Sequence, residues 1–186
     1  MKDKVILICN QKGGVGKTLI ADELAFAFDR DKVPYNLYDL DQQGGSVHGE
    51  KEAPNAVVTI VDTPGALQED MLKWMKEADL IIIPTRMSPR DMPPLETMID
   101  MVSKNDISAD VIFVFNGWNR YRATAEFEEW FKETYPKAKS IAISQSEAIT
   151  QAALDGKSVV EYKPSSVPAQ KIAELVKLVK KILKLK

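Results

Sequence analysis

Six short apolar segments alternate with amphipathic segments along the 186-residue chain, and this alternation restricts the fold more than any other feature. The apolar segments are rich in valine and isoleucine and nearly continuous in apolarity, which is typical of strands buried on both faces of a sheet. We predict strands at residues 4–9, 35–40, 57–62, 80–84, 110–116 and 140–144.

The segments between these strands carry apolar residues at helical spacing, so each presents one stripe to a sheet. Ser144 and Glu147 have capping-box spacing, which predicts the start of one of these helices. The expected helices cover residues 17–30, 66–78, 91–104, 123–135, 146–155 and about 167–185. The alternation predicts an α/β fold, with a doubly wound, mostly parallel sheet and helices on both faces, in a single domain over residues 1–186.

Composition narrows the classes of function. Hydrophobic residues make up 45% of the chain, and the net charge of −2 excludes a basic field over the whole protein, so contact with a polyanion must be local. The single cysteine, Cys9, excludes an internal disulfide and a thiolate-bound iron–sulfur cluster. Apolar runs are too short for a membrane span or a signal peptide, so we expect a cytoplasmic protein.

Two further features are given no catalytic role at this stage. The segment 42–56 is Gly-rich and polar and lacks periodicity, which predicts a mobile loop. The only histidine, His48, lies in this segment without a visible partner. Cys9 is interpreted as a small buried core residue.

The stretch "NQKGGVGKT" at residues 10–18 directly follows the first apolar segment. A Gly-rich turn between a strand and a helix is the context of a phosphate-binding loop, whose backbone N–H groups and helix dipole attract phosphate. Lys17 would reach the β- and γ-phosphates, and the Thr18 hydroxyl would coordinate Mg²⁺. The predicted nucleotide contacts are Gly13, Gly14, Val15, Gly16, Lys17 and Thr18, although Gln11 replaces the first glycine of the ordinary pattern.

Carboxylates follow the next two strands. Asp39 and Asp41 end the second strand and point to the same side of it, while Asp62 ends the third. The carboxyl ends of parallel strands form the ligand crevice of an open α/β sheet. An acid at the end of a buried strand needs a partner or a metal, whereas Asp39 and Asp41 could also cap the following turn.

Several of these segments resemble one family. "KGGVGKT" is similar to the deviant Walker A loop of ParA/MinD-type P-loop ATPases, "DLDQQGG" to their next motif and "VVTIVDTPG" to their Walker B strand. "SEAITQAALDGKSVVEY" resembles small ParA proteins, so the likeness spans nearly the whole chain. It implies an ATPase that uses ATP and Mg²⁺ and forms a homodimer with two ATP molecules between the subunits.

The resemblance also implies roles for single residues. Lys12 matches the signature lysine, which reaches across the dimer to the partner's phosphates, while Lys17 serves its own nucleotide. Asp41 would orient the attacking water, and Asp39 would support Mg²⁺ or the switch loop. Asp62 would hold Mg²⁺ through water, so the expected metal residues are Thr18, Asp39 and Asp62.

Asn116, placed at the end of the fifth strand, matches an asparagine that contacts adenine in this family. An ordinary asparagine in a strand-end turn is the alternative. The guanine-reading motif Asn-Lys-x-Asp is missing, which favours ATP over GTP.

The family likeness implies a ParA-like ATPase for plasmid or chromosome partition. The ATP dimer would bind DNA without sequence preference and so associate with the nucleoid. A centromere-binding ParB-like or ParG-like partner would stimulate hydrolysis and release it. Candidate DNA contacts are Arg86, Arg90, Arg120, Arg122 and the lysines of the last helix, although such a residue is more often a solvated surface charge.

Two alternatives remain. The last helix carries six lysines between Lys171 and Lys186 beside an apolar stripe, so it could lie on an anionic membrane as in MinD-like relatives. We favour packing of that stripe on the sheet, which makes membrane contact unlikely. A nucleotide-gated tether with little turnover is the other alternative, since Gln42 replaces the family's proline and the 42–56 loop is shortened.

The role implied for Asp41 can be tested directly. We expect Asp41→Ala to slow phosphate release by about a hundredfold or more, because the attacking water loses its orienting carboxylate, and to trap the ATP dimer. Phosphate release would be compared with that of Glu50→Ala, an acid of the same loop. Undiminished release from Asp41→Ala would remove this residue from the mechanism.

Overall fold

The computed structural model describes residues 3–40, 45–65 and 71–185. Its six strands form one sheet in the order β2-β3-β1-β4-β5-β6, and every neighbouring pair is parallel. The strands are β1 Lys4–Ile8, β2 Tyr35–Asp39, β3 Val58–Asp62, β4 Leu80–Thr85, β5 Asp110–Trp118 and β6 Lys139–Ser144. The predicted parallel α/β sheet is confirmed.

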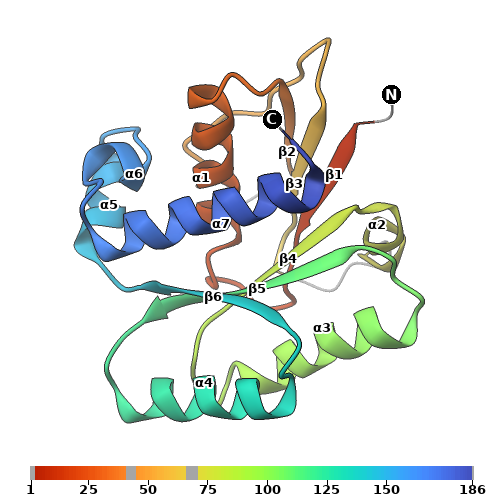
Figure 1. Ribbon diagram of the computed structural model, residues 1–186, viewed down its shortest axis with the longest axis vertical. Coiled ribbons are helices and arrows are strands. Elements are labelled where there is room, and N and C mark those ends of the chain that lie inside the picture. Colours follow the sequence, from red (N-terminus) through yellow and green to blue (C-terminus); the bar gives the residue numbers. More distant parts are fainter. Residues whose placement is uncertain (1–2, 41–44, 66–70, 186) are drawn as a thin grey trace.

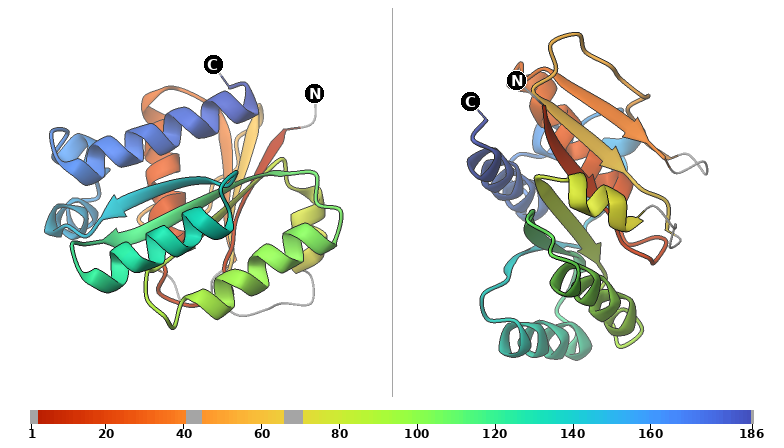
Figure 2. Two further views of the ribbon diagram at one scale, coloured as in Figure 1. Left: turned by 60° about the horizontal axis from the view of Figure 1, so that its bottom comes forward. Right: turned by 90° about the vertical axis from the view of Figure 1, so that its right-hand side faces the viewer.

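Helices cover both faces of this sheet (Figures 1 and 2). One core joins the sheet to α1, α5, α6 and α7, and a second core joins the opposite face to α2, α3 and α4. The helices are α1 Lys17–Arg30, α2 Met71–Glu77, α3 Met92–Lys104, α4 Arg122–Thr134, α5 Glu147–Leu154, α6 Val159–Tyr162 and α7 Val167–Leu183. The predicted double winding is therefore confirmed, while the short α6 was not predicted.

The apolar stripe of α7 lies in the first core. Ile172, Leu175 and Val179 are fully buried there against α1 and the sheet. The sequence analysis favoured this packing over a membrane-facing stripe, and the structure confirms it. Among the described residues, no helix is both long enough and apolar enough to cross a membrane.

Two boundaries differ from the predictions. Ser144 is the last residue of β6, and the cap of α5 is Ser146, whose hydroxyl oxygen accepts the Ala148 N–H at 3.3 Å. The capping-box prediction was thus wrong by two residues, because two Ser residues lie close to the same helix start. Asn116 does not end β5 either, since the strand continues to Trp118 through a register shift.

The loop after β2 is anchored where the structure describes it. The Asp22 carboxylate on α1 accepts hydrogen bonds from the Ser46 hydroxyl at 2.9 Å and from the N–H groups of Val47 at 2.9 Å and His48 at 3.0 Å. The His48 ring also contacts Asp22 at 3.0 Å and packs edge-on against Phe26. The predictions of a mobile loop and a partnerless His48 are therefore wrong for residues 46–48.

These contacts stabilise the ionised form of Asp22. Burial by itself would raise the pKa of this carboxyl group, but the hydrogen bonds from His48, Val47 and Ser46 outweigh burial and leave the pKa below its usual value. The loop is thus anchored to the charged side chain of Asp22. The helical pattern of α1 gave no sign of this role.

A second carboxylate on α1 anchors the start of α6. Glu23 is 5% exposed and accepts hydrogen bonds from the Ser158 hydroxyl at 2.5 Å and the Val159 N–H at 2.9 Å. Burial raises the pKa of Glu23 above its usual value in spite of these bonds.

This raised pKa has a predictable effect on stability. Folded Glu23 binds more protons than unfolded Glu23 between its unfolded pKa, near 4.5, and its higher folded pKa, so its contribution to the free energy of unfolding falls as pH rises through that window. Glu23→Gln should therefore become less destabilised, relative to wild type, as pH rises from 4.5 towards neutrality. Urea unfolding at several pH values measures this difference.

The exposed Glu129→Gln on α4 is the matched control and should show no such trend. Glu23→Ala should cost about 2 kcal/mol near pH 4.5, because it leaves two buried donors without acceptors, and this cost should shrink with rising pH in parallel with that of Glu23→Gln. A pH-independent difference between Glu23→Gln and wild type would contradict the assigned pKa shift.

Candidate nucleotide-binding site

The glycine-rich loop lies at the carboxyl end of β1, in the middle of the sheet between β3 and β4. The strand order reverses at this point, which is where open α/β sheets bind ligands. Gly14 and Gly16 have φ values of 71° and 99°, a region that favours glycine. The loop thus turns sharply from β1 into α1, as the sequence predicted.

Two buried asparagines hold the loop in shape. The Asn10 amide donates to the Pro84 carbonyl at 2.7 Å, and its oxygen accepts the Lys12 N–H at 3.0 Å. The Asn116 amide donates to the Val15 carbonyl at 3.0 Å. Asn116 therefore fixes the loop from β5. The sequence analysis missed Asn10, whose signal was a polar residue directly after an apolar strand.

Lys17 begins α1 and is only 5% exposed, with its ammonium 3.4 Å from the Lys12 carbonyl. The helix starts at Gly16 without a side-chain cap, so its first N–H groups are available to phosphate oxygens. A buried lysine beside uncapped N–H groups at a helix N-terminus attracts a multiply charged phosphate chain.

The metal-binding residues that the sequence proposed lie together where the structure describes them. The Thr18 hydroxyl donates to Asp62 at 2.7 Å, and Asp62 is 1% exposed at the end of β3. Asp39 lies opposite Asp62 in the β2–β3 register. Hydroxyl and carboxylate oxygens suit Mg²⁺, which usually takes one or two protein ligands and completes its shell with phosphate and water. Asp41 lies outside the described residues.

This donor set fits Mg²⁺ only with a nucleotide present. No cluster of three or more His, Cys, Asp or Glu side chains arranged for a metal ion occurs within residues 3–40, 45–65 and 71–185. When bound, Mg²⁺ neutralises phosphate charge, and Thr18 and Asp62 would position it.

The segment after β3 touches the loop. A Cβ added to Gly65 would lie 2.9 Å from both the Cα and the N of Gly13. Because no side chain fits between these backbones, a displacement of the phosphate loop would also displace Gly65.

Lys12 points away from its own loop. Its ammonium forms a 2.5 Å ion pair with Asp91, and the side chains are 37% and 2% exposed respectively. The other Asp91 oxygen accepts the Ser88 N–H at 3.1 Å and the Ser88 hydroxyl at 2.5 Å. The sequence analysis missed Asp91, because nothing local in the sequence connects it to a lysine 79 residues earlier.

Two other residues near the loop clarify earlier assignments. Arg86, a candidate DNA contact that follows β4, donates to the Gly14 carbonyl at 3.4 Å and so contacts the phosphate loop. Cys9 is fully buried, and burial raises its pKa to about 12, which fits the predicted core role.

The central strand of this parallel sheet leads through a glycine-rich loop into a helix that starts with a lysine and a threonine. An aspartate ends the neighbouring strand. This combination defines a P-loop nucleotide-binding protein. A family model for the CobQ/CobB/MinD/ParA nucleotide-binding domain matches residues 6–159. The chain belongs to this family, and it is a ParA/MinD-type P-loop ATPase that uses ATP and Mg²⁺.

Individual relatives agree with this assignment. The chain is 26% identical over 185 residues to the maintenance of carboxysome distribution protein A of Gloeobacter kilaueensis, covering 86% of this chain and 85% of that protein. The ATP complex of an McdA variant from Cyanothece superposes with a TM-score of 0.77 at 17% identity, over 99% of this chain and 97% of that one. The Mg-ADP complex of Pyrococcus horikoshii MinD gives 0.73 at 17% identity and 97% coverage of both chains.

Gly16 offers a sharp test of the loop. A Cβ at this position would lie 2.0 Å from the Asn116 amide nitrogen, on a backbone with φ of 99°. We expect Gly16→Ala to cost about 3 kcal/mol in ATP binding, or about a hundredfold in affinity. Isothermal titration with ATP and Mg²⁺ measures this loss.

Gly156→Ala is the matched control. Gly156 also has a positive φ, 64°, but it follows α5 and a Cβ there meets no atom within 4 Å. This variant should lose stability without losing ATP affinity. Wild-type ATP binding by Gly16→Ala would show that the nucleotide does not need this loop conformation.

Proposed function

We propose that this protein is a positioning ATPase that works as an ATP-dependent dimer on DNA. The observation that carries the proposal is the Lys12–Asp91 ion pair, which keeps the signature lysine beside the phosphate loop but directed away from it. Such a lysine suits phosphates that another subunit brings. The solved complex of MinC with MinD from Aquifex aeolicus is an example of a partner-bound relative.

The ion pair supplies a gate for dimer formation. Asp91 is almost fully buried, so withdrawing Lys12 leaves a carboxylate to which, among the described residues, only Ser88 donates hydrogen bonds. The free-energy cost of leaving Asp91 without Lys12 is offset only when the ammonium binds a more strongly charged anion. The triphosphate bound to a facing subunit is such an anion. Binding of ATP to both subunits would therefore convert the resting ion pair into a contact across the dimer.

The remaining residues have defined tasks in hydrolysis of the γ-phosphate by water. Lys17 and the loop N–H groups hold the phosphates and offset the charge that develops on them. Thr18, Asp39 and Asp62 position Mg²⁺, and Asp41 orients the attacking water. Asn116, which holds the loop at Val15, would contact adenine through its remaining polar atom.

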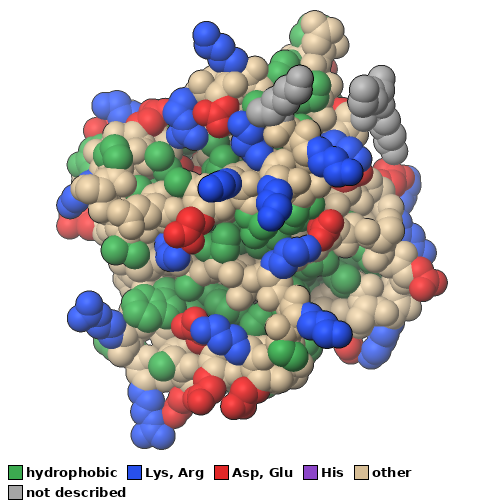
Figure 3. All heavy atoms as spheres, viewed as in Figure 1, with side chains coloured by type: hydrophobic (Ala, Val, Ile, Leu, Met, Phe, Trp, Pro, Cys, Tyr) green, Lys and Arg blue, Asp and Glu red, His purple; other side chains and the backbone are tan. Residues whose placement is uncertain are grey.

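The surface of α7 is the proposed DNA contact. Its apolar stripe is buried, so its lysines face outward, and Figure 3 shows Lys and Arg side chains along this helix with a few acids between them. Lys171 pairs with Glu174 at 2.8 Å and Lys180 with Asp31 at 3.2 Å. Lys177 and Lys181 make no such pair among the described residues, so they are the first candidates for phosphate contacts.

The family assignment supports a positioning role without fixing the cargo. A relative is named for carboxysome distribution, whereas the family likeness of the sequence pointed to plasmid or chromosome partition. We propose that residues 1–186 act as one domain in the cytoplasm, on the nucleoid when ATP-bound, with a ParB-like or ParG-like partner linking it to its cargo. The buried stripe of α7 removes the feature that favoured a MinD-like membrane role.

Lys12→Ala tests the proposal. Wild-type protein should sediment with nonspecific DNA only with ATP, and less so at higher salt. Lys12→Ala should bind ATP as a monomer with an affinity within about threefold of wild type, because Lys17 and the loop N–H groups remain. It should lose dimer and DNA binding, because the contact across the dimer is removed. It should also be less stable than wild type, because Asp91 loses its ion-pair partner. Light scattering and co-sedimentation measure these properties.

Lys104→Ala, which removes an exposed lysine on α3, is the control and should behave as wild type. Normal ATP dimers of Lys12→Ala would contradict the sandwich arrangement. ATP-dependent sedimentation of the wild type with anionic liposomes instead of DNA would contradict the proposed DNA role and favour a membrane-positioning ATPase.

A further inference from the structure

One part of the sheet lacks a covering helix among the described residues. On the face that carries α2, α3 and α4, the second core covers β1, β4 and β5, whereas β2 contributes no residue to it. Parallel sheets are normally covered on both faces, because their strands are apolar on both sides. Among the described residues, the area over β2 and the adjacent part of β3 is therefore less covered than is usual and needs a physical explanation.

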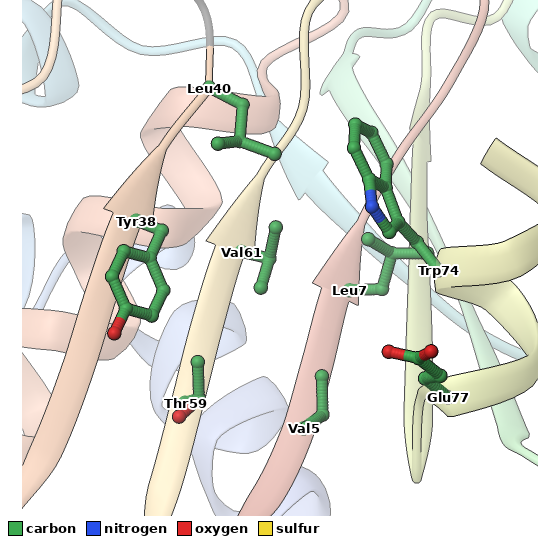
Figure 4. A pocket seen from close by; sticks show the side chains of 8 residues that line it. All are labelled: Val5, Leu7, Tyr38, Leu40, Thr59, Val61, Trp74 and Glu77. Atoms are coloured by element: carbon green, nitrogen blue, oxygen red, sulfur yellow. The ribbon is translucent and has the colours of Figure 1, made fainter. Parts of the chain in front are cut away.

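This area forms an open groove of about 280 Å³, which we call the β2–β3 groove. Figure 4 shows side chains of the three strands standing side by side, flanked by residues of α2. Its apolar residues are Val5, Leu7, Tyr38, Leu40, Val61 and Trp74. Leu40 is 36% exposed, and Tyr38, Val61 and Trp74 are only partly buried.

The groove is separate from the phosphate loop. None of the residues from Gly13 to Thr18 lines it, and its floor follows the length of the strands up to Leu40, one residue past the end of β2. The ATPase function therefore does not account for this apolar surface.

The charges around the groove are acidic. Glu77 lines its edge on α2. The Tyr38 hydroxyl donates to Glu52 at 2.9 Å, and Thr59, at the amino-terminal end of the groove, donates to Asp3. The groove thus combines an apolar floor with carboxylates on its rim.

Two lysines close to these strands are engaged in other contacts. Lys51 pairs with Asp29 at 2.6 Å and lies over the Tyr35 ring, which belongs to the opposite core. Lys4 alternates with Val5 along β1, so it points to the other face, and it pairs with Asp79 at 2.7 Å. These two lysines do not neutralise the rim, whereas Lys73 and Lys76, exposed on α2, line a separate pocket together with Glu77. We therefore expect an occupant of the groove to supply positive charge mainly to Glu52 and Asp3.

We infer that the β2–β3 groove docks a basic amphipathic helix from another protein. A helix is the usual cover of a parallel sheet, and its apolar stripe would fill the floor while Lys or Arg beside the stripe meets the carboxylates. Five-residue strands span about 17 Å, which a helix of about three turns matches. A second copy of this chain fits poorly, because a symmetric contact would bring two acidic rims together.

Designed peptides of about 14 residues test this inference, since that length spans the groove. The probes are a fluorescein-labelled Leu/Lys amphipathic helix, a Leu/Glu helix with the same apolar stripe, and a scrambled Leu/Lys sequence. Fluorescence anisotropy with wild-type protein should show binding of the Leu/Lys helix about tenfold or more tighter than of either other probe.

Variants locate the binding. Val61→Arg places a charge in the floor and should weaken binding of the Leu/Lys helix by about tenfold or more. Glu77→Lys alters an exposed residue, so it should fold normally, weaken the Leu/Lys helix and strengthen the Leu/Glu helix. Leu154→Arg is the control, because Leu154 is 76% exposed on α5, outside the groove, and this variant should bind as wild type.

Three results would overturn the inference. The first is equal binding of the Leu/Lys helix to wild type, Val61→Arg and Glu77→Lys, which would mean that the acidic protein attracts the peptide elsewhere. The second is the absence of binding by either amphipathic helix. The third is nucleotide-independent self-association of the wild type, in sedimentation velocity, that Val61→Arg abolishes, since the occupant would then be a second copy.

Discussion

The pairing of β1 with β3 on one side and β4 on the other is the constraint on which the site depends. This position puts the end of β1 beside Asp62 of β3 and beside the Pro84 carbonyl of β4, which accepts a hydrogen bond from Asn10. The loop is therefore held from both neighbours before any ligand binds. Its glycines supply the turn, but the flanking strands supply the metal-side carboxylate and the anchor.

Under our proposal, Lys12 and Asp91 give this loop a resting state and an ATP-dimer state. The pair joins the loop to the start of α3, and Asp91 is too buried to be left alone without a cost of about 3 kcal/mol or more. A cost of that size keeps the signature lysine in the resting position until a competing anion arrives. In this proposal, the Lys12 ammonium either pairs with Asp91 of its own subunit or contacts the phosphates of the partner subunit in the dimer.

The groove and the nucleotide site share one strand end. Leu40, which lines the groove, follows Asp39, and its N–H donates to the Asp62 carbonyl at 2.9 Å. A helix bound in the groove would therefore press on a residue bonded to the metal-side strand. Under our proposals, this contact offers a route by which a partner could influence hydrolysis without touching the nucleotide.

Much of the architecture could be predicted from the sequence, because it is encoded locally. The valine- and isoleucine-rich runs located all six strands within two residues, and helical spacing located α1, α3, α4 and α7 nearly as well. The glycine-rich stretch after an apolar run identified the phosphate loop, and Asp62 stood at the end of its strand as expected. Asp41 and the single-domain assignment stay predictions.

Only the tertiary structure decided which residues meet across the fold. It set the order of the strands. It also brought together residues 26 to 79 positions apart, in the Asn10–Pro84, Lys12–Asp91 and His48–Asp22 contacts. A periodic pattern shows which face of an element is apolar, but not which element covers that face. The surface of β2 and β3 that no described helix covers could not be predicted for the same physical reason: hydrophobicity is a property of each residue, whereas burial depends on how the chain packs.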